Sequence, residues 1–128
     1  MELCTILTMK LRMEGNNIRL RLKKSDIEKL KKEGIVGETV AFSDNLYFYY
    51  KLKTHQHDQE IDATFVRNAV QITLPLGIAT TWMNTDQVSL KYTLDSGLNI
   101  LIEKDFPCKT REDEDKKDTF EDLALKNC

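Results

Sequence analysis

The chain has 128 residues, is 41% hydrophobic and carries a net charge of -2, which suits one globular domain with its own core. A pI near 5.7 argues against a dedicated nucleic-acid binder, because the phosphate backbone favours strongly basic proteins. The cysteines are odd in number and no apolar stretch approaches the length of a membrane span, so we expect a cytoplasmic protein without a disulfide framework.

The first predicted element is a β-hairpin. Apolar and charged residues alternate from Met9 to Met13 and again from Ile18 to Leu22, and Gly15-Asn16-Asn17 between them is typical of a tight turn. A slip of one residue in the pairing would place Arg19 and Arg21 in the core. We therefore expect a well-defined register.

A short helix is predicted next, from Ser25 to Glu33. Ser25 and Glu28 have the spacing of a capping box, and Gly34 is suited to a left-handed helix stop. Strands at 36–42 and 46–52 then predict a second hairpin. The first half of the chain is thus predicted to be hairpin, helix, hairpin.

The second half repeats this order with weaker local signals. Strands are predicted at 61–66, 70–74, 87–93 and 98–105, with a helix that begins at Pro75. Gly77 and several β-branched residues lower the helix propensity. Packing of Ile78 and Trp82 onto the sheet therefore has to support this helix.

The apolar residues of the two halves match at a fixed offset of 52 positions, so that Ile18 corresponds to Val70 and Leu20 to Ile72. Such a period indicates two copies of one supersecondary unit. We predict an α+β fold: an antiparallel sheet of about eight strands, open or barrel-like, with two helices on one face. The domain is predicted at 9–108, with pseudo-repeats at 9–53 and 61–105, an N-terminal extension at 1–8 and a charged, disordered tail at 109–128.

Cations gather on one face of the predicted first hairpin. They are Lys10, Arg12, Arg19, Arg21 and Lys23. Clustered guanidinium groups suit two-point contacts with phosphate or carboxylate, so this hairpin is a candidate anion site. The alternative is a solvated polar face whose cations discourage pairing between sheet edges. Because like charges across strands cost stability, we expect a compensating carboxylate or ligand.

The last predicted strand supplies two carboxylates on one face, Glu103 and Asp105. They can pair with the arginines or ligate Mg²⁺, and ion pairing is the simpler expectation because hard cations need more oxygen ligands than one strand offers. His55 and His57 also share one side of an extended segment, but a third zinc ligand is missing. We predict no cofactor and no metal site.

Two tyrosines complete the candidate ligand-binding set. Alternation sends Phe48 and Tyr50 to the core and leaves Tyr47 and Tyr49 on the polar face. Outward aromatic rings can stack on a ligand or line an interface. If the sheet is open, pairing through an edge strand or around these tyrosines predicts a homodimer.

Three segments have the character of family motifs. They are Met9-Lys10-Leu11-Arg12 with Gly15-Asn16-Asn17-Ile18-Arg19-Leu20-Arg21-Leu22 and Ser25, then Asp86-Gln87-Val88, then Ile100-Leu101-Ile102-Glu103-Lys104-Asp105-Phe106 with Cys108. Together they resemble a family of small, uncharacterised bacterial proteins classed as a domain of unknown function. The resemblance implies a bacterial cytosolic protein whose domain begins near Met9, and it implies no established activity.

The predicted architecture is also similar to that of the triphosphate-tunnel proteins, whose closed barrel places cations and metal-binding carboxylates in its lumen. This sequence lacks their alternating E-x-E-x-K signature: Glu14 follows Arg12 with no second glutamate beside it. The similarity therefore concerns the fold and says little about chemistry.

Two functions remain open. The first is a non-catalytic binding protein for an anionic small molecule or an acidic partner, because the cation row comes without a phosphate loop, a nucleophile elbow or a paired CxxC motif. The second is a metal-dependent phosphohydrolase, in which Glu103 and Asp105 hold Mg²⁺ and the arginines hold phosphate. The second requires the sheet to close, so that the first hairpin and the last strand face each other.

Overall fold

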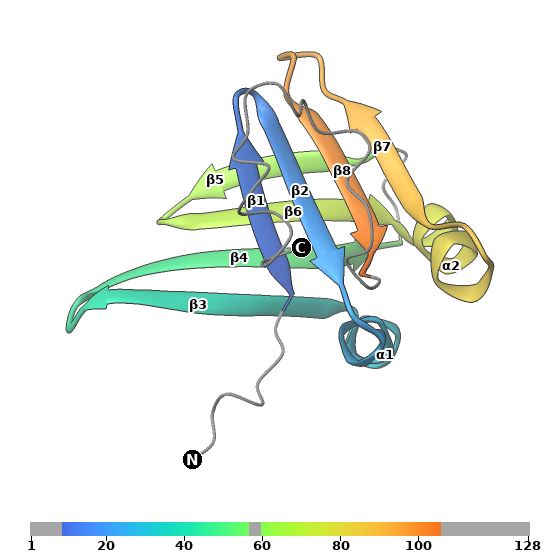
Figure 1. Cartoon of the computed structure of the whole chain (residues 1–128), viewed down its shortest axis with the longest axis horizontal. Coiled ribbons are helices and arrows are strands. Elements are labelled where there is room, and N and C mark those ends of the chain that lie inside the picture. The colour runs from blue at the N-terminus through green and yellow to red at the C-terminus, as the bar shows by residue number, and fades with distance from the viewer. Residues whose placement is uncertain (1–8, 57–59, 106–128) are drawn as a thin grey trace, which may run out of the picture.

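The computed structural model describes residues 9–56 and 60–105, which form eight strands and two helices (Figure 1). In chain order the elements are β1 (Lys10–Glu14), β2 (Asn17–Leu22), α1 (Lys24–Glu33), β3 (Ile35–Ser43), β4 (Leu46–His55), β5 (Asp62–Val66), β6 (Ala69–Pro75), α2 (Leu76–Asn84), β7 (Ser89–Thr93) and β8 (Asn99–Lys104). The predicted α+β class and the predicted order of elements are confirmed. The predictions for residues 1–8 and 109–128 lie outside the described residues.

The strands form two sheets rather than one. One sheet has the order β1-β2-β8-β7 and the other the order β3-β4-β6-β5. Figure 1 shows the two sheets stacked, with their strands crossing at a steep angle. Hairpins pair antiparallel as predicted, but the two central pairings, β2 with β8 and β4 with β6, are parallel. Each sheet keeps two outer strands, so neither closes into a barrel.

The two repeats are interleaved between the sheets. The β1–β2 hairpin of the first copy lies in one sheet and its β3–β4 hairpin in the other, and the second copy is distributed in the opposite way. Hairpin register repeats at the predicted offset, since Lys10 pairs with Arg21 and Asp62 with Thr73. The register between the central strands does not repeat at this offset. Asn17 of β2 lies opposite Asn99 of β8, so the equivalent partner of Ala69 in β6 would be Tyr47 of β4. Ala69 instead lies opposite Tyr49, two residues further along β4. A displacement by two residues keeps every side chain on its original face.

The helices lie on the same side of the sandwich, where the chain passes from one sheet to the other (Figure 1). In α1 the predicted capping box is displaced: the helix begins at Lys24, and the carboxylate of Asp26, not Glu28, accepts a 2.9 Å hydrogen bond from the backbone N–H of Lys23. The predicted stop is confirmed, because Gly34 has a φ of 78° and its N–H donates to Leu30 O. Such a φ is one that glycine adopts without strain.

In α2 the predicted packing is half right. Trp82 is fully buried and its indole N–H donates to Val88 O at 2.9 Å. Ile78, which we expected to pack on the sheet, is 39% exposed, and Ala79 takes the buried position instead. Ile78 and Ala79 lie four and three residues before Trp82, so each is its neighbour on the helix surface, on opposite sides of it. The sheets cover the side of Ala79 and leave Ile78 at the margin of the buried stripe. Within the described residues, no helix is long and apolar enough to cross a membrane.

The hydrophobic core lies between the two sheets. Inward side chains alternate along each central strand, as in β2, where Ile18, Leu20 and Leu22 are buried. The repeat partners Val70, Ile72 and Leu74 in β6 are buried in the same way. This alternation turns the charged residues of β1 and β2 to the outside of the sandwich, which positions the candidate site.

Candidate functional site

The outer face of the β1-β2-β8-β7 sheet brings together most of the predicted site residues. Strand registers align its outward side chains in three rows across the four strands. The middle row consists of Arg12, Arg19, Leu101 and Lys91. The row on one side consists of Glu14, Asn17, Asn99 and Thr93, and the row on the other side of Lys10, Arg21, Glu103 and Ser89. We call these twelve positions, with Asp105 after β8, the cationic face.

The cationic face is positive although the chain is acidic. It holds five cations, two on β1, two on β2 and Lys91 on β7, against the three carboxylates Glu14, Glu103 and Asp105, which gives +2 where the whole chain carries -2. The predicted row of cations is thus extended by Lys91. Lys91 belongs to the second copy of the repeat, and the parallel pairing of β2 with β8 brings its hairpin beside the first one.

A buried carboxylate holds the centre of this face together. Parallel pairing places Arg21 directly opposite Glu103, and Arg21 Nε lies 2.7 Å from Glu103 Oε2. Arg19 Nε lies 3.5 Å from the same oxygen. The Glu103 side chain is only 11% exposed. This confirms the expectation that a carboxylate compensates the arginines, because a charge at this depth is tolerated when it is paired and hydrogen-bonded.

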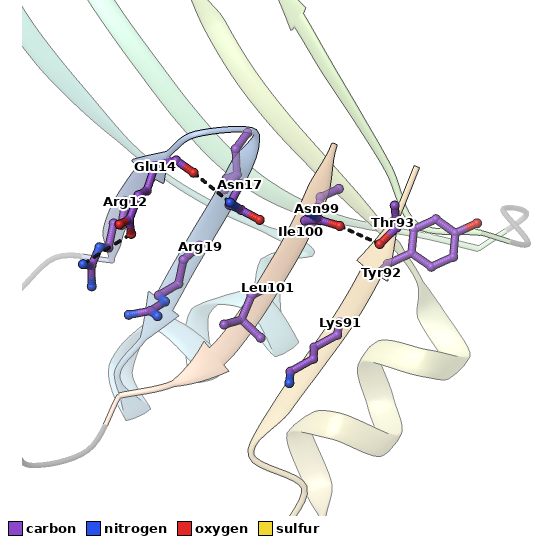
Figure 2. A pocket seen from close by; sticks show the side chains of 11 residues that line it. Arg12, Glu14, Asn17, Arg19, Lys91, Tyr92, Thr93, Asn99, Ile100 and Leu101 are labelled. Carbon is purple, nitrogen blue, oxygen red and sulfur yellow. Dashed lines mark hydrogen bonds and ion pairs between the residues drawn. The ribbon is translucent and has the colours of Figure 1, made fainter. Parts of the chain in front are cut away.

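A depression lies across the middle of the face. Its volume is about 340 Å³, and Figure 2 shows side chains of all four strands around it. Its charged residues are Arg12, Glu14, Arg19 and Lys91. Leu101 lies between Arg19 and Lys91 and gives the floor an apolar patch (Figure 2).

Hydrogen-bond donors dominate this depression. Arg12 is only loosely held by Glu14, at 3.5 Å, and Lys91 has no ion pair among the described residues. Thr93 Oγ1 donates to Asn99 Oδ1 at 2.7 Å, which leaves the amide NH₂ of Asn99 as a donor. A site with cations and amide donors matches a ligand whose oxygen atoms only accept.

Other predicted residues lie outside the depression. Lys10 pairs with Asp105 at 3.2 Å, on the margin of the cationic face. Lys23 is the N-cap residue of α1, where its Nζ lies 3.7 Å from Asp26. Neither lysine lines the depression.

Tyr47 and Tyr49 are also separate from the cations. Both lie on β4, in the other sheet, with ring centroids 6.2 Å apart, and Tyr47 OH donates to Asp44 O at 2.9 Å. The structure therefore does not bring the predicted tyrosines and arginines into one site. The reason is that α1 carries the chain from one sheet to the other between β2 and β4.

Another depression beside β7 is acidic. Its volume is about 560 Å³, and Glu60, Asp62 and Asp95 lie around Tyr92. Tyr92 OH donates to Glu60 Oε1 at 2.8 Å. This hydrogen bond, followed by desolvation and by the charges of Glu60, Asp95 and Asp62, raises the pKa of Tyr92 above its usual value. The phenol is therefore held neutral as a donor.

Metal ligation has little geometric basis in the described part of the chain. Among residues 9–56 and 60–105, no group of three or more histidines, cysteines and carboxylates is placed to hold a metal ion. Glu103 is engaged by arginines and Asp105 by Lys10. His57 and Cys108 lie outside the described residues.

Sequence reasoning missed the outward polar residues of the depression other than the arginines, and the apolar floor at Leu101. The polar residues are Glu14, Asn17, Lys91, Thr93 and Asn99. Their outward orientation follows from strand alternation, which the sequence does indicate. Their proximity depends on the parallel pairing of β2 with β8, between segments about 80 residues apart, for which no local signal exists.

Comparisons with known proteins locate the chain in one family. No curated protein and no solved structure matches it. The similarity to triphosphate-tunnel proteins is therefore unsupported, and the two open sheets lack the closed barrel of that architecture. The model of a family of unknown function, DUF7009, matches residues 9–123, almost the whole chain, and the protein therefore belongs to that family.

Proposed function

We propose that the protein is a non-catalytic binding protein for a small anion, which docks on the cationic face. The observation that carries this proposal is the depression of about 340 Å³, where Arg12, Arg19 and Lys91 meet from three different strands. The chain gathers like charges there at a cost in stability, and Glu103 compensates only the arginines of β2. A bound phosphate or carboxylate would compensate the remainder.

The ligand is small in this proposal. The depression has a volume near the lower end of ligand pockets, and Leu101 at its centre fits a ligand with an apolar part between or beside its anionic groups. The overall charge of -2 argues against a nucleic acid as the natural partner. The reducing cytosol is the compartment that we propose for this activity, in line with the cysteine usage.

A metal-dependent phosphohydrolase has less support. In that alternative Glu103 and Asp105 hold a cation, whereas Glu103 Oε2 accepts from Arg21 Nε at 2.7 Å. The face is also the outside of an open sheet, where water competes with every polar contact. The arrangement favours binding without chemistry.

Thermal unfolding with added anions tests the proposal. Inorganic phosphate, pyrophosphate, nucleotides and dicarboxylates are compared with chloride at equal ionic strength, because salt screens surface charge without occupying a site. A ligand at 100 times its Kd stabilises the folded state by about 2.7 kcal/mol. We expect the double substitution Arg12→Gln and Lys91→Gln to abolish this stabilisation.

The matched control is Lys29→Gln with Lys32→Gln, which removes two exposed cations from α1. The control should keep the response to anions. An equal response in both double variants, or no response of the parent protein to any anion in the series, would contradict a site on the cationic face.

A further inference from the structure

The β3–β4 hairpin extends beyond its own sheet as a two-stranded arm. β6 pairs with β4 only from Tyr49 onward, whereas β3 pairs with β4 as far as Leu46. Figure 1 shows this hairpin reaching past β1, which is the edge strand of the other sheet. We call residues 39–48 the arm. Two-stranded ribbons are marginally stable alone in water, so this arm needs a partner surface.

The arm also carries apolar side chains that the described residues, 9–56 and 60–105, leave exposed. Val40 is 41% exposed, Leu46 52% and Phe42 68%. Val40 and Phe48 lie opposite each other, and alternation from buried Val36 and Tyr50 places them on the face that is buried further along the same strands. The arm thus continues the core-facing side of the sheet into solvent.

Strand β3 is an edge strand with little protection against pairing. It has nine residues and one charge, Glu38, while the edge strand β1 has three charges in five residues. The remaining edge strands, β5 and β7, are five residues long. Natural sheets protect their edges with charges, short strands or bulges, and β3 has only the single charge of Glu38 and one irregularity near its end, between Ala41 and Ser43.

We propose that a second copy of this chain covers the arm, through antiparallel pairing of β3 with β3 of the partner. A two-fold axis perpendicular to the sheet keeps both core-facing sides on the same side of the joined sheet. Because the strands run in opposite directions, the tip of each arm then lies beside the partner's body. Phe42 and Leu46 are covered there.

The charge on β3 is compatible with pairing to a second copy, and the area sets what the pairing has to bury. Glu38 lies opposite a neutral residue in a two-fold register that is centred on Thr39 or on Val40, so no like charges meet. A stable dimer buries about 800 Å² per partner, and Phe42, at 68% exposure, contributes roughly 100–170 Å² of that. The apolar side chains alone fall short of this area, so the pairing of the strands has to supply the remainder.

Solution mass measured by light scattering and sedimentation over a wide range of concentrations tests the proposal. The chain of 14.9 kDa should have twice this mass in the dimer. Phe42→Lys, and separately Thr39→Lys, should shift the mass to that of the monomer, the first by charging the covered face and the second by placing like charges across the paired edges. Far-UV circular dichroism checks that both variants keep their fold.

The matched control is Ile78→Lys on α2. The exposed fraction of Ile78, 39%, is similar to that of Val40, 41%, and Ile78 lies on a helix away from the arm. This variant should stay dimeric. A parent protein that is monomeric at every concentration, a mass that grows without limit, or a dimer that survives Phe42→Lys and Thr39→Lys would overturn the proposal. The dimer does not depend on the anion site, which lies on the other sheet, so each proposal can fail without the other.

Discussion

Glu103→Gln is the substitution for which the structure supports the most direct estimate. The change removes one charge and almost no volume, and leaves an amide oxygen that still accepts a hydrogen bond. Removing one partner of a buried ion pair costs about 3–5 kcal/mol. Arg19, at 23% exposure, remains accessible to water, so we expect a loss at or just below the lower end of this range, about 2–3 kcal/mol.

Urea unfolding followed by tryptophan fluorescence measures this loss, because Trp82 is the only tryptophan and is fully buried. The midpoint should fall while the slope of the transition stays constant. In a thermal scan, the same loss corresponds to a decrease in Tm of roughly 10–20 °C. Glu14→Gln serves as the control, since Glu14 is 73% exposed and lies 3.5 Å from Arg12; this variant should change stability by less than about 0.5 kcal/mol.

The double substitution Glu103→Leu with Arg21→Leu separates a charge effect from a packing effect. Apolar residues of similar volume can replace a buried ion pair at little cost, so the double variant should be more stable than Glu103→Gln. If Glu103→Gln and Glu14→Gln lose the same small amount of stability, the two arginines do not depend on Glu103 and our account of the centre of the face is wrong.

Further substitutions test other parts of the fold by the same urea and thermal assays. Trp82→Phe removes the hydrogen bond to Val88 O and leaves a small cavity, so we expect a loss of about 2 kcal/mol, read by circular dichroism; an unchanged Tm would contradict this role of the indole. Gly34→Ala places a methyl group at a φ of 78° and should cost about 1 kcal/mol, whereas Gly77→Ala, inside α2 with nothing within 4 Å of the added carbon, should be neutral or stabilising. Tyr50→Phe leaves Met9 O without its 2.7 Å donor and should cost about 1–2 kcal/mol, and a neutral effect would mean that water replaces the phenol.

Local signals in the sequence predicted the elements well. The hairpin of β1 and β2 follows from alternation and from the turn at Gly15, and the end of α1 follows from Gly34. The offset of 52 residues predicted the second set of elements where propensity was weak, as in α2. Each of these predictions depends on residues that are close in sequence or related by the repeat.

The arrangement of the sheets was beyond such signals. An eight-stranded sheet and two four-stranded sheets place the same side chains inside, because alternation defines a face without defining which strand lies beside it. The pairing of Glu103 with the arginines was expected from charge alone, whereas Lys91 and Asn99 join the site through a parallel pairing between the two repeats. The tyrosines of β4 were included in one site with the arginines because the change of sheet at α1 has no signature in the sequence.

The interleaving of the repeats has a consequence for how the chain acquires its structure. The contact of Arg21 with Glu103 joins residues 82 positions apart, and β2 has no central neighbour until β8 is available. Loop-closure entropy makes such pairings slow to form. During synthesis or in a refolding experiment, the β1–β2 hairpin therefore cannot complete its sheet until β8 is available to pair with β2. Neither repeat is then a folding unit by itself, and the complete cationic face forms only when β8 has paired with β2, so that binding of the proposed anion would report completed folding of the whole domain.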